Sequence, residues 1–195
     1  MRNIFKQLGR FVAFVLMLPF IITFSLSSLA LSPENKDTLF TAYSQFISLF
    51  PGKVGAFLRA AFYRVVMQSY DPSAHTSFAT LFSQVNTKIA SGVYIGPQCN
   101  IGKCNIGEDT LLGSAVHIMS GKQQHIFEDI DKLIREQGGV FAKINVGKNC
   151  WIGNGALVMA NVGDDCIIAA GSVVISDIPN KSIVAGNPGK VIKTR

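Results

Sequence analysis

Large aliphatic residues recur at every sixth position through the second half of the chain. One series runs from Ile89 to Ile118 with a single five-residue step, and another runs from Val146 to Val184 with two four-residue steps. A period of six matches neither an amphipathic helix nor a single alternating strand, and such self-similarity indicates a repeat architecture. The members are Ile89, Ile95, Ile101, Ile106, Leu112, Ile118, Val146, Ile152, Val158, Val162, Ile168, Val174, Ile178 and Val184.

The period fits a coil of short parallel strands joined by tight corners, in which each side of a prism contributes one inward aliphatic side chain. Glycine often follows the aliphatic, where a corner needs unusual backbone angles or a close approach between chains. A small side chain stands four residues after the aliphatic, so stacked coils would bury two columns. Cys99, Cys150 and Cys166 fall in this second column.

The four cysteines are therefore interpreted as packing residues. They show neither C-x-x-C spacing nor clustered histidines, which argues against a zinc site and against a redox pair. A cysteine can serve as a small apolar side chain without any chemistry. Reduced cysteines favour the cytosol.

The first 85 residues follow a different pattern. Of the 14 Phe, 12 precede residue 83, whereas 15 of the 18 Gly follow residue 91. Residues 11–33 carry no charge and follow three basic residues, and about 20 apolar residues can cross a bilayer. A secretory signal cleaved after Ala30 is the alternative, but the apolar run is longer than a typical signal core. We expect an α-helical membrane-anchor region over residues 1–85.

Two short amphipathic helices rich in aromatic residues are predicted at 39–50 and 54–67. They are too short to cross a bilayer, and Lys53, Arg59 and Arg64 are placed to meet lipid phosphates. The alternative is that both segments pack on the C-terminal domain or on a partner subunit.

The orientation of the anchor follows from its charges. A single straight span would separate the repeat domain from the basic N-terminus, which the positive-inside rule keeps in the cytosol. Pro19 lies in the middle of the apolar run, and a helix kinked there could dip into the bilayer and return. We therefore expect the inner (cytoplasmic) membrane, with the catalytic domain facing the cytoplasm.

The overall charge adds little. A formal net charge of +6 suits an anionic ligand or a membrane lipid surface without singling out either. The sequence has no G-x-S-x-G elbow, no phosphate-binding glycine loop and no nucleic-acid motif. Nucleic acid is therefore not an expected partner.

The segments IGPQCNIG, VGKNCWIGNGA, AAGSVV and AGNPGKVIK resemble the hexapeptide-repeat acyltransferases, within them the xenobiotic and sugar O-acetyltransferase branch. The resemblance covers residues 86–195, the predicted acyltransferase domain. It implies a left-handed parallel β-helix, whose handedness comes from the resemblance alone because parallel crossovers are otherwise right-handed. It also implies a homotrimer that uses acetyl-CoA at active sites between neighbouring subunits.

A long excursion over residues 119–145 interrupts the repeat. Excursions of this length inside a compact repeat are usually functional, although a charged arm that only grips the next subunit is the alternative. Acyl transfer from a thioester to a hydroxyl needs a base near neutral pH, which histidine supplies. The resemblance of IMSGKQQH to the family's catalytic loop implies that His125 is this base.

Other site residues accompany His125. By analogy with related chemistry, an acidic residue after it could orient the imidazole, and among Glu128, Asp129 and Asp131 we expect Asp129. His117 precedes an inward aliphatic, so it lies at a corner or on an outward face, where it could hydrogen-bond the substrate or remain solvated.

The resemblance also implies residues that bind the cofactor. Trp151 stands in CWIG, near the active site of related enzymes, although packing against a neighbouring subunit is equally open. Gly171 lies in AAGSVV, and Lys190 and Lys193 lie in the segment that lines the coenzyme A groove, where they would meet phosphates. Many relatives have Thr-Lys where this chain has Ile175-Ser176, so one phosphate-binding lysine is missing.

The sequence predicts a membrane-associated O-acetyltransferase acting on a sugar hydroxyl of a lipid-linked glycan or polysaccharide precursor. Alternatives are a soluble sugar, amino sugar or small-molecule acceptor, or a non-catalytic scaffold. A zinc carbonic anhydrase of this fold would need three histidines from neighbouring coils. The chain offers only His117 and His125 near the repeats, with His75 outside them, so no metal is expected.

Overall fold

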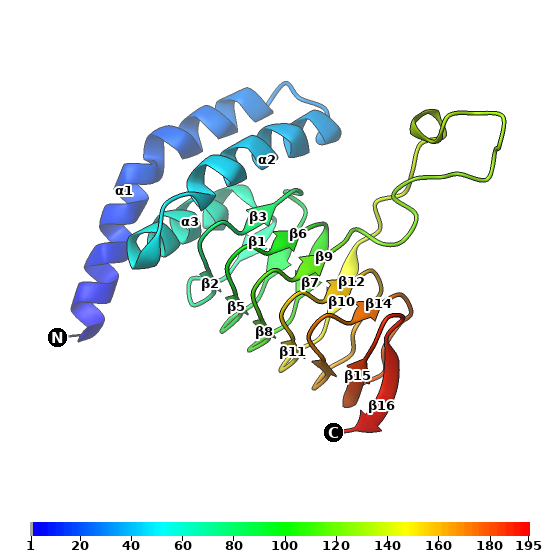
Figure 1. Ribbon diagram of the computed structural model, residues 1–195. Helices are drawn as coiled ribbons and strands as arrows, with labels where there is room; N and C mark the ends of the chain where they lie inside the picture. The colour runs from blue at the N-terminus through cyan, green and yellow to red at the C-terminus, as the bar shows by residue number, and fades with distance from the viewer. Residues whose placement is uncertain (1) are drawn as a thin grey trace.

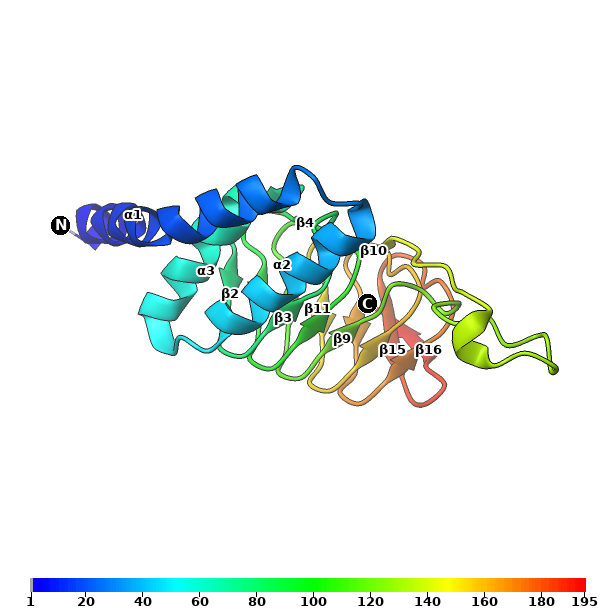
Figure 2. The same ribbon diagram turned by 90° about the horizontal axis from the view of Figure 1, so that it is seen from above.

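A layer of three helices covers one end of a coil of short parallel strands (Figure 1). The computed structural model describes residues 2–195. The helices are α1 (Arg2–Ser28), α2 (Pro33–Ser48) and α3 (Gly52–Val66). Figure 2, which looks along a perpendicular direction, shows the helices at one end and the C-terminal strands at the other.

The strands form three sheets that the chain visits in turn, about 6 times in all. Sheet A has the order β1-β4-β7-β10, sheet B the order β16-β15-β13-β11-β8-β5-β2, and sheet C the order β14-β12-β9-β6-β3. All pairings are parallel except that of β15 with β16. The bounds are β1 (Ser69–Tyr70), β2 (His75–Thr76), β3 (Leu81–Phe82), β4 (Lys88–Ile89), β5 (Tyr94–Ile95), β6 (Asn100–Ile101), β7 (Cys104–Ile106), β8 (Leu111–Leu112), β9 (His117–Ile118), β10 (Ile144–Val146), β11 (Trp151–Ile152), β12 (Leu157–Val158), β13 (Ile167–Ile168), β14 (Val173–Val174), β15 (Ser182–Ala185) and β16 (Lys190–Thr194).

The predicted fold class, a left-handed parallel β-helix preceded by α-helices, is confirmed. The coil begins at Ser69, however, one whole turn before residue 86, where the repeat was expected to start. The inward positions of this first turn are Tyr70, Thr76 and Phe82, all buried and spaced by six. The aliphatic period does not include these positions, because their side chains are aromatic or polar.

Both predicted columns lie inside the coil. Every aliphatic of the two series is buried, and so are the small residues of the second column. All four cysteines are buried and free, as expected for packing residues. Their neighbours in the column include Thr110, which donates its hydroxyl hydrogen to the Gly147 carbonyl at 2.8 Å, and Ser172, whose buried hydroxyl has no hydrogen-bond partner among the described residues.

The glycines that follow the aliphatics allow neighbouring coils to approach. A Cβ added at Gly96 would lie 2.6 Å from the carbonyl oxygen of Gly113, and one at Gly107 would lie 2.6 Å from the carbonyl carbon of Gly147. Left-handed backbone is found instead at other corner positions, for example at Gly171 (φ +68°). Of the two reasons proposed for the repeat glycines, close approach therefore holds for Gly96 and Gly107.

Helix α1 is continuous through Pro19, and the chain reverses only after Ser28. The predicted kink at Pro19 thus does not turn the chain back. One face of α1 is buried and includes Met17 and Phe24. The Phe24 ring packs edge-to-face on the rings of Phe40 and Phe62, which belong to α2 and α3. The three helices therefore share an aromatic core.

Arg59 corrects one expectation about these helices. We expected it to meet lipid phosphates, but its side chain is 0% exposed. Its Nε donates to the Thr76 carbonyl at 3.0 Å, and its guanidinium also donates to the Phe50 carbonyl at 2.7 Å. The guanidinium also donates to the carbonyls of Ile47 and Ser48, which gives hydrogen-bond partners to the last carbonyl groups of α2. Helices α2 and α3 thus pack on the first coil, as the alternative proposed.

Candidate active site

The excursion after β9 forms an arm that projects away from the coil (Figures 1 and 2). Its two sides run next to each other and are joined by backbone hydrogen bonds. The amides of Ala142, Val140 and Ile126 donate to carbonyls of the opposite side at 2.9, 2.7 and 3.0 Å. The tip contains a single short 3-10 turn, Ile134–Glu136. The arm is therefore a narrow paired ribbon rather than a loose loop.

His125 lies on this ribbon, one residue before the hydrogen bond between Ile126 and Gly138. Its side chain is exposed. Among residues 2–195, no hydrogen bond or ion pair to its imidazole is found. The backbone of the opposite side passes so close that a Cβ at Gly139 would collide with the Gln124 carbonyl. The ribbon thus fixes the backbone of His125 while leaving its ring free to contact another molecule.

Asp129 is engaged elsewhere. Its carboxylate forms an ion pair with Lys132 at 2.8 Å and accepts a hydrogen bond from the Asp131 amide at 3.1 Å. Its backbone amide and carbonyl bond the side chain of Gln137. These contacts shape the tip of the arm. The orienting role expected for Asp129 is therefore not seen within this chain.

The arm carries apolar side chains that nothing in this chain covers. Ile130 is 93% exposed, far more than an isoleucine of a folded domain usually is. A contiguous exposed apolar surface commonly marks a contact with another molecule. The other members are Ile126, Phe127, Leu133, Ile134, Val140 and Phe141.

His117 points outward from sheet C at the base of the arm. It is aligned with Asn100 of β6 and Leu157 of β12 and is exposed. The predicted outward position is thus observed. Sequence reasoning placed His75 outside the repeats, but it lies on β2 in the first coil, where its ring stacks on that of Tyr94 at 5.3 Å.

The predicted cofactor residues gather on and beside sheet B. Trp151 of β11 is 56% exposed, and its row continues through Ile167 and Ile183 to Lys193 of β16. Three strand spacings of about 4.8 Å place Trp151 and Lys193 about 14 Å apart. Lys190 lies at the start of the same strand β16. We call Trp151, Lys190 and Lys193 the sheet B face.

Gly171 lies beside this face, at the corner between sheets B and C. Its φ is +68°, a conformation that favours glycine, and open space surrounds the position of a Cβ. Sheet B is a different side of the coil from the position where the arm leaves sheet C and returns to sheet A. A single chain therefore does not bring His125 and Trp151 into one site.

A cavity at the base of the arm contains residues that sequence reasoning missed. It has a volume of about 510 Å³ and is lined by Lys122 and Gln123 of the arm and by Asn161 and Asp177 of the coil. The Asn161 amide group donates to the Asp177 carboxylate at 3.2 Å. The only sequence signal was their place outside the buried columns, which many surface residues share.

The described residues include no candidate metal centre. Between residues 2 and 195, no three His, Cys, Asp or Glu side chains come close enough to hold an ion. The three histidines lie apart, on β2, on β9 and in the arm.

Solved structures share this fold. No protein-family model and no curated protein matches the sequence. A galactoside acetyltransferase in complex with coenzyme A superposes with a TM-score of 0.56 at 19% identity, over 85% of this chain and 84% of the other. A maltose O-acetyltransferase from Clostridium difficile 630 gives a TM-score of 0.55 at 20% identity, over 81% of this chain and 87% of the other.

A third structure is a point mutant of an N-acyltransferase from Bacillus cereus, in complex with dTDP-4-amino-4,6-dideoxyglucose and coenzyme A. It superposes with a TM-score of 0.56 at 15% identity, over 67% of this chain and 74% of the other. At such identities the likeness establishes the fold alone. This chain has the parallel β-helix fold of the hexapeptide-repeat acyltransferases that its sequence resembles.

Proposed function

We propose that this protein is an acetyl-CoA-dependent O-acetyltransferase that acts at a membrane on a sugar hydroxyl of a lipid-linked glycan or polysaccharide precursor. The observation that carries the proposal is an exposed histidine on an arm that projects from a β-helix. Three solved acyltransferases, two of them in complex with coenzyme A, have the same fold. The arm supplies the base and the coil supplies a surface for the cofactor.

The sheet B face has the chemistry that coenzyme A requires. An exposed indole offers an apolar surface for the pantetheine arm, and Lys190 and Lys193 offer ammonium groups to phosphates. When bound there, acetyl-CoA would supply an acetyl group activated as a thioester. Because position 176 is serine rather than lysine, Lys190 and Lys193 of β16 would have to provide the positive charge for the phosphates of the cofactor.

His125 has the proton-transfer role. Its imidazole would take the proton of the acceptor hydroxyl as that oxygen attacks, and would then return a proton to the departing sulfur. The cavity at the base of the arm offers Lys122, Asn161 and Asp177 as hydrogen-bonding groups for a sugar. Its closeness to His125 along the ribbon makes it the acceptor pocket in this proposal.

A homotrimer would complete the site. His125 and Trp151 belong to different sides of one chain, so a shared site needs the arm of one subunit and the sheet B face of its neighbour. The exposed apolar side chains of the arm would be buried in the same contact.

Membrane association is supported by α1. Residues Ile4–Ser28 form a helix whose most apolar 18-residue window has a mean hydropathy of 2.2 and is 22% buried. Its outer face exposes Phe5, Leu8, Phe11 and Leu16 among others. Because the inner face packs on α2 and α3, we propose that α1 lies in the cytoplasmic leaflet of the inner membrane through its outer face.

The decisive test is acetyl transfer by wild type and by His125→Ala. Labelled acetyl-CoA and isolated membranes are supplied to each protein, and label in the glycolipid fraction is measured. Loss of a general base is expected to lower the rate about 10²- to 10⁴-fold. His75→Ala is the matched control, because it removes a histidine far from the arm. Equal transfer by wild type and His125→Ala would rule out the proposed base.

An amino group is the second candidate acceptor. The fold neighbour from Bacillus cereus is an N-acyltransferase solved with an amino sugar nucleotide. Mild alkali distinguishes the two products, because it cleaves an acetyl ester and leaves an acetamide intact. Label that survives alkali would favour N-acetylation over O-acetylation.

A further inference from the structure

A second basic site lies where the turn between α1 and α2 meets the coil, far from the C-terminal strands. It is a cavity of about 510 Å³ with Lys36 on the helix side and Lys103 on the coil side. Leu31 of the turn also lines it. The arm returns to the coil at the start of β10, which pairs with β7, the strand that directly follows Lys103.

A third lysine, Lys143, lies next to this cavity without lining it. Its Nζ donates to the side-chain oxygens of Gln68 at 2.6 Å and Asn86 at 2.8 Å, and both residues line the cavity. Neutral amides therefore hold the ammonium at the wall without cancelling its charge. Burial, followed by the charges of Lys88 and Lys103, lowers the pKa of Lys143.

The cations outnumber the anions here. Across residues 2–195 the ion pairs are those of Lys132 with Asp129 and Arg135 with Glu136, both in the arm. Asp37 is the acidic residue of the cavity wall, and its carboxylate accepts a hydrogen bond from the Val85 amide at 2.8 Å. Burial raises the pKa of Asp37, whereas the nearby charges of Lys103 and Lys36 act to lower it, so Asp37 offsets part of their positive charge. The excess of lysines over this one carboxylate at a concave surface attracts an anion.

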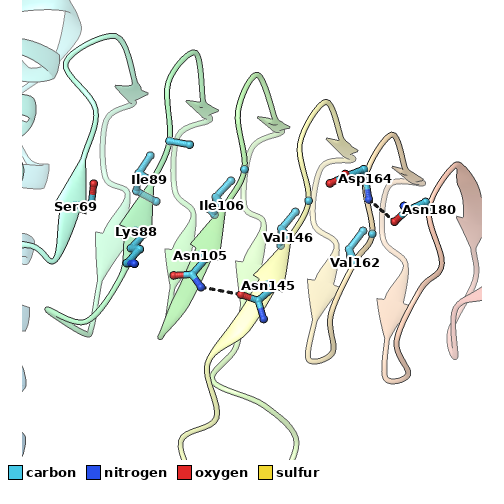
Figure 3. Close-up of a pocket in the computed structure, with 14 residues that line it drawn as sticks. Ser69, Lys88, Ile89, Asn105, Ile106, Asn145, Val146, Val162, Asp164 and Asn180 are labelled. Carbon is cyan, nitrogen blue, oxygen red and sulfur yellow. Dashed lines mark hydrogen bonds between the residues drawn. The ribbon is translucent and has the colours of Figure 1, made fainter.

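The backbone explains why these lysines converge. Lys88, Lys103 and Lys143 stand at or directly before the starts of β4, β7 and β10, three successive strands of sheet A. Figure 3 shows Lys88 beside Asn105 and Asn145, with which it is aligned on this sheet. Parallel stacking thus places Lys103 and Lys143 next to each other in neighbouring coils, whereas Lys88 is aligned with Asn105 and Asn145, two residues further along the strands.

The helix side of the cavity combines charged and apolar groups. Leu31 lines it, and Leu26 and Leu29 nearby are 64% and 81% exposed. Apolar side chains next to ammonium groups match the two parts of a phospholipid, its acyl chains and its phosphate. A soluble anion would use only the lysines.

We propose that this cavity binds the phosphate headgroup of an anionic membrane lipid, or of a phosphate-linked lipid acceptor of the same chemistry. The inference rests on the membrane association in the proposed function, but it needs neither the base nor the cofactor. It places a lipid phosphate next to the base of the arm that carries His125.

The test is calorimetric titration of the full chain in detergent micelles with dihexanoyl phosphatidic acid. Saturable binding to wild type is expected. Lys103→Gln/Lys143→Gln should bind roughly 30-fold more weakly, because each lysine near an anionic lipid adds a factor of about five. Lys148→Gln is the matched control, since this exposed lysine lies at another corner and should bind like wild type.

Three outcomes would overturn the proposal. One is binding by the double variant equal to wild type; another is inorganic phosphate binding as tightly as the lipid, which would make the site one for soluble anions. The third is displacement of the lipid by coenzyme A, which would assign the lysines to the cofactor. Dihexanoyl phosphatidylcholine should not bind saturably, because its headgroup has no net charge.

A folding defect and a failure of the proposed function are both separable from these outcomes. Lys36→Gln changes only the helix side of the cavity, so it tests the site if loss of the Lys143 hydrogen bonds destabilises the coil. Coenzyme A binding is measured on the same samples. If a lysine variant loses lipid binding but still binds coenzyme A, the change concerns the cavity alone. If wild type fails to bind coenzyme A, that result contradicts the proposed acetyltransferase function.

Discussion

At the residue scale, Arg59 shows how a buried charge can serve the fold. Sequence patterns place an arginine on an amphipathic helix at the surface, because burying a charge is costly unless it is fully hydrogen-bonded. Here four carbonyl groups from the end of α2 and from β2 receive its hydrogens. The partners come from segments distant in sequence, so the sequence alone could not reveal them.

Arg59→Met is expected to lower the free energy of unfolding by about 3 kcal/mol, because it leaves several buried carbonyls without donors. Thermal unfolding in detergent, followed by circular dichroism, measures the loss. Arg64→Met removes an exposed arginine of the same helix and should change stability by less than about 0.5 kcal/mol. Equal melting temperatures for the two variants would contradict the role given to Arg59.

The cysteines should be inert in the folded protein. Burial raises the pKa of Cys104 to about 12 and that of Cys150 to about 11, from an ordinary value of 9.0. Since the thiolate is the reactive form, iodoacetamide should label native protein at pH 8 very slowly and denatured protein quickly. Unfolded thiols ionise first as the pH rises, so their contribution to stability is lost above about pH 9.

Mass spectrometry after timed labelling checks this expectation. Rapid labelling of the native chain at pH 8 would mean that the coil opens far more often than its buried columns suggest.

The site residues were less predictable than the packing residues. Burial of the cysteines followed from the repeat, because a column position fixes the inward direction of a side chain. The role of Asp129 depends on the path of a long excursion, where spacing does not fix geometry. His125 was found by resemblance, and its catalytic role stays a prediction.

At the scale of elements, the repeat glycines set the distance between coils. Gly107→Ala would place a Cβ 2.6 Å from the Gly147 carbonyl carbon and the Lys148 amide nitrogen, both backbone atoms that cannot rotate away. We expect a loss of about 1–3 kcal/mol in unfolding free energy, typical of overpacking. Chemical denaturation measures it.

Gly9→Ala is the matched control, because its Cβ would meet only the Phe57 ring, at an ordinary 3.4 Å. Alanine also favours the helix there. A loss of stability as large for Gly9→Ala as for Gly107→Ala would show that close approach between coils is not the cause.

The first coil illustrates a limit of pattern analysis. An aliphatic period finds the coils from residue 88 onward but misses the first turn, whose inward residues are aromatic or polar. The reason is its neighbour: this turn packs on helices, so Tyr70 and Phe82 contact the aromatic ring of Tyr63 in α3. An end coil therefore differs from interior coils because it faces a different partner.

At the scale of the whole molecule, the outer face of α1 determines membrane association in our proposal. Val12→Lys/Leu16→Lys places two charges on exposed positions of one face and leaves buried Met17 and Phe24 unchanged. Each change removes about 1.5–3 kcal/mol of apolar burial in the bilayer, so release into the soluble fraction is expected. Fractionation and immunoblotting measure it.

Leu111→Lys serves as the control, since it adds a charge at an exposed apolar position of the coil. It should remain with the membranes. Retention of the α1 variant in the membrane fraction would mean that another part of the protein holds it there.

The sequence predicted the architecture more fully than the assembly. A period of six fixes which side chains face inward in every coil, and hence the fold. The association of subunits depends instead on the direction of the arm and on which outer face it meets, and neither leaves a periodic signal. The sequence shows that residues such as Ile130 are apolar. Only the structure shows that their side chains are exposed and that no other part of this chain packs on them.

The Arg59 hydrogen bonds bear on how far the arm lies from the helix layer. They join α3 and the end of α2 to strand β2 of the first coil. In the membrane-bound arrangement that we propose, the number of coils sets the distance between the helix layer and the arm, in steps of about 4.8 Å. The arm leaves the third coil. Inserting or removing one coil before it would move the base of the arm along the coil axis by one such step.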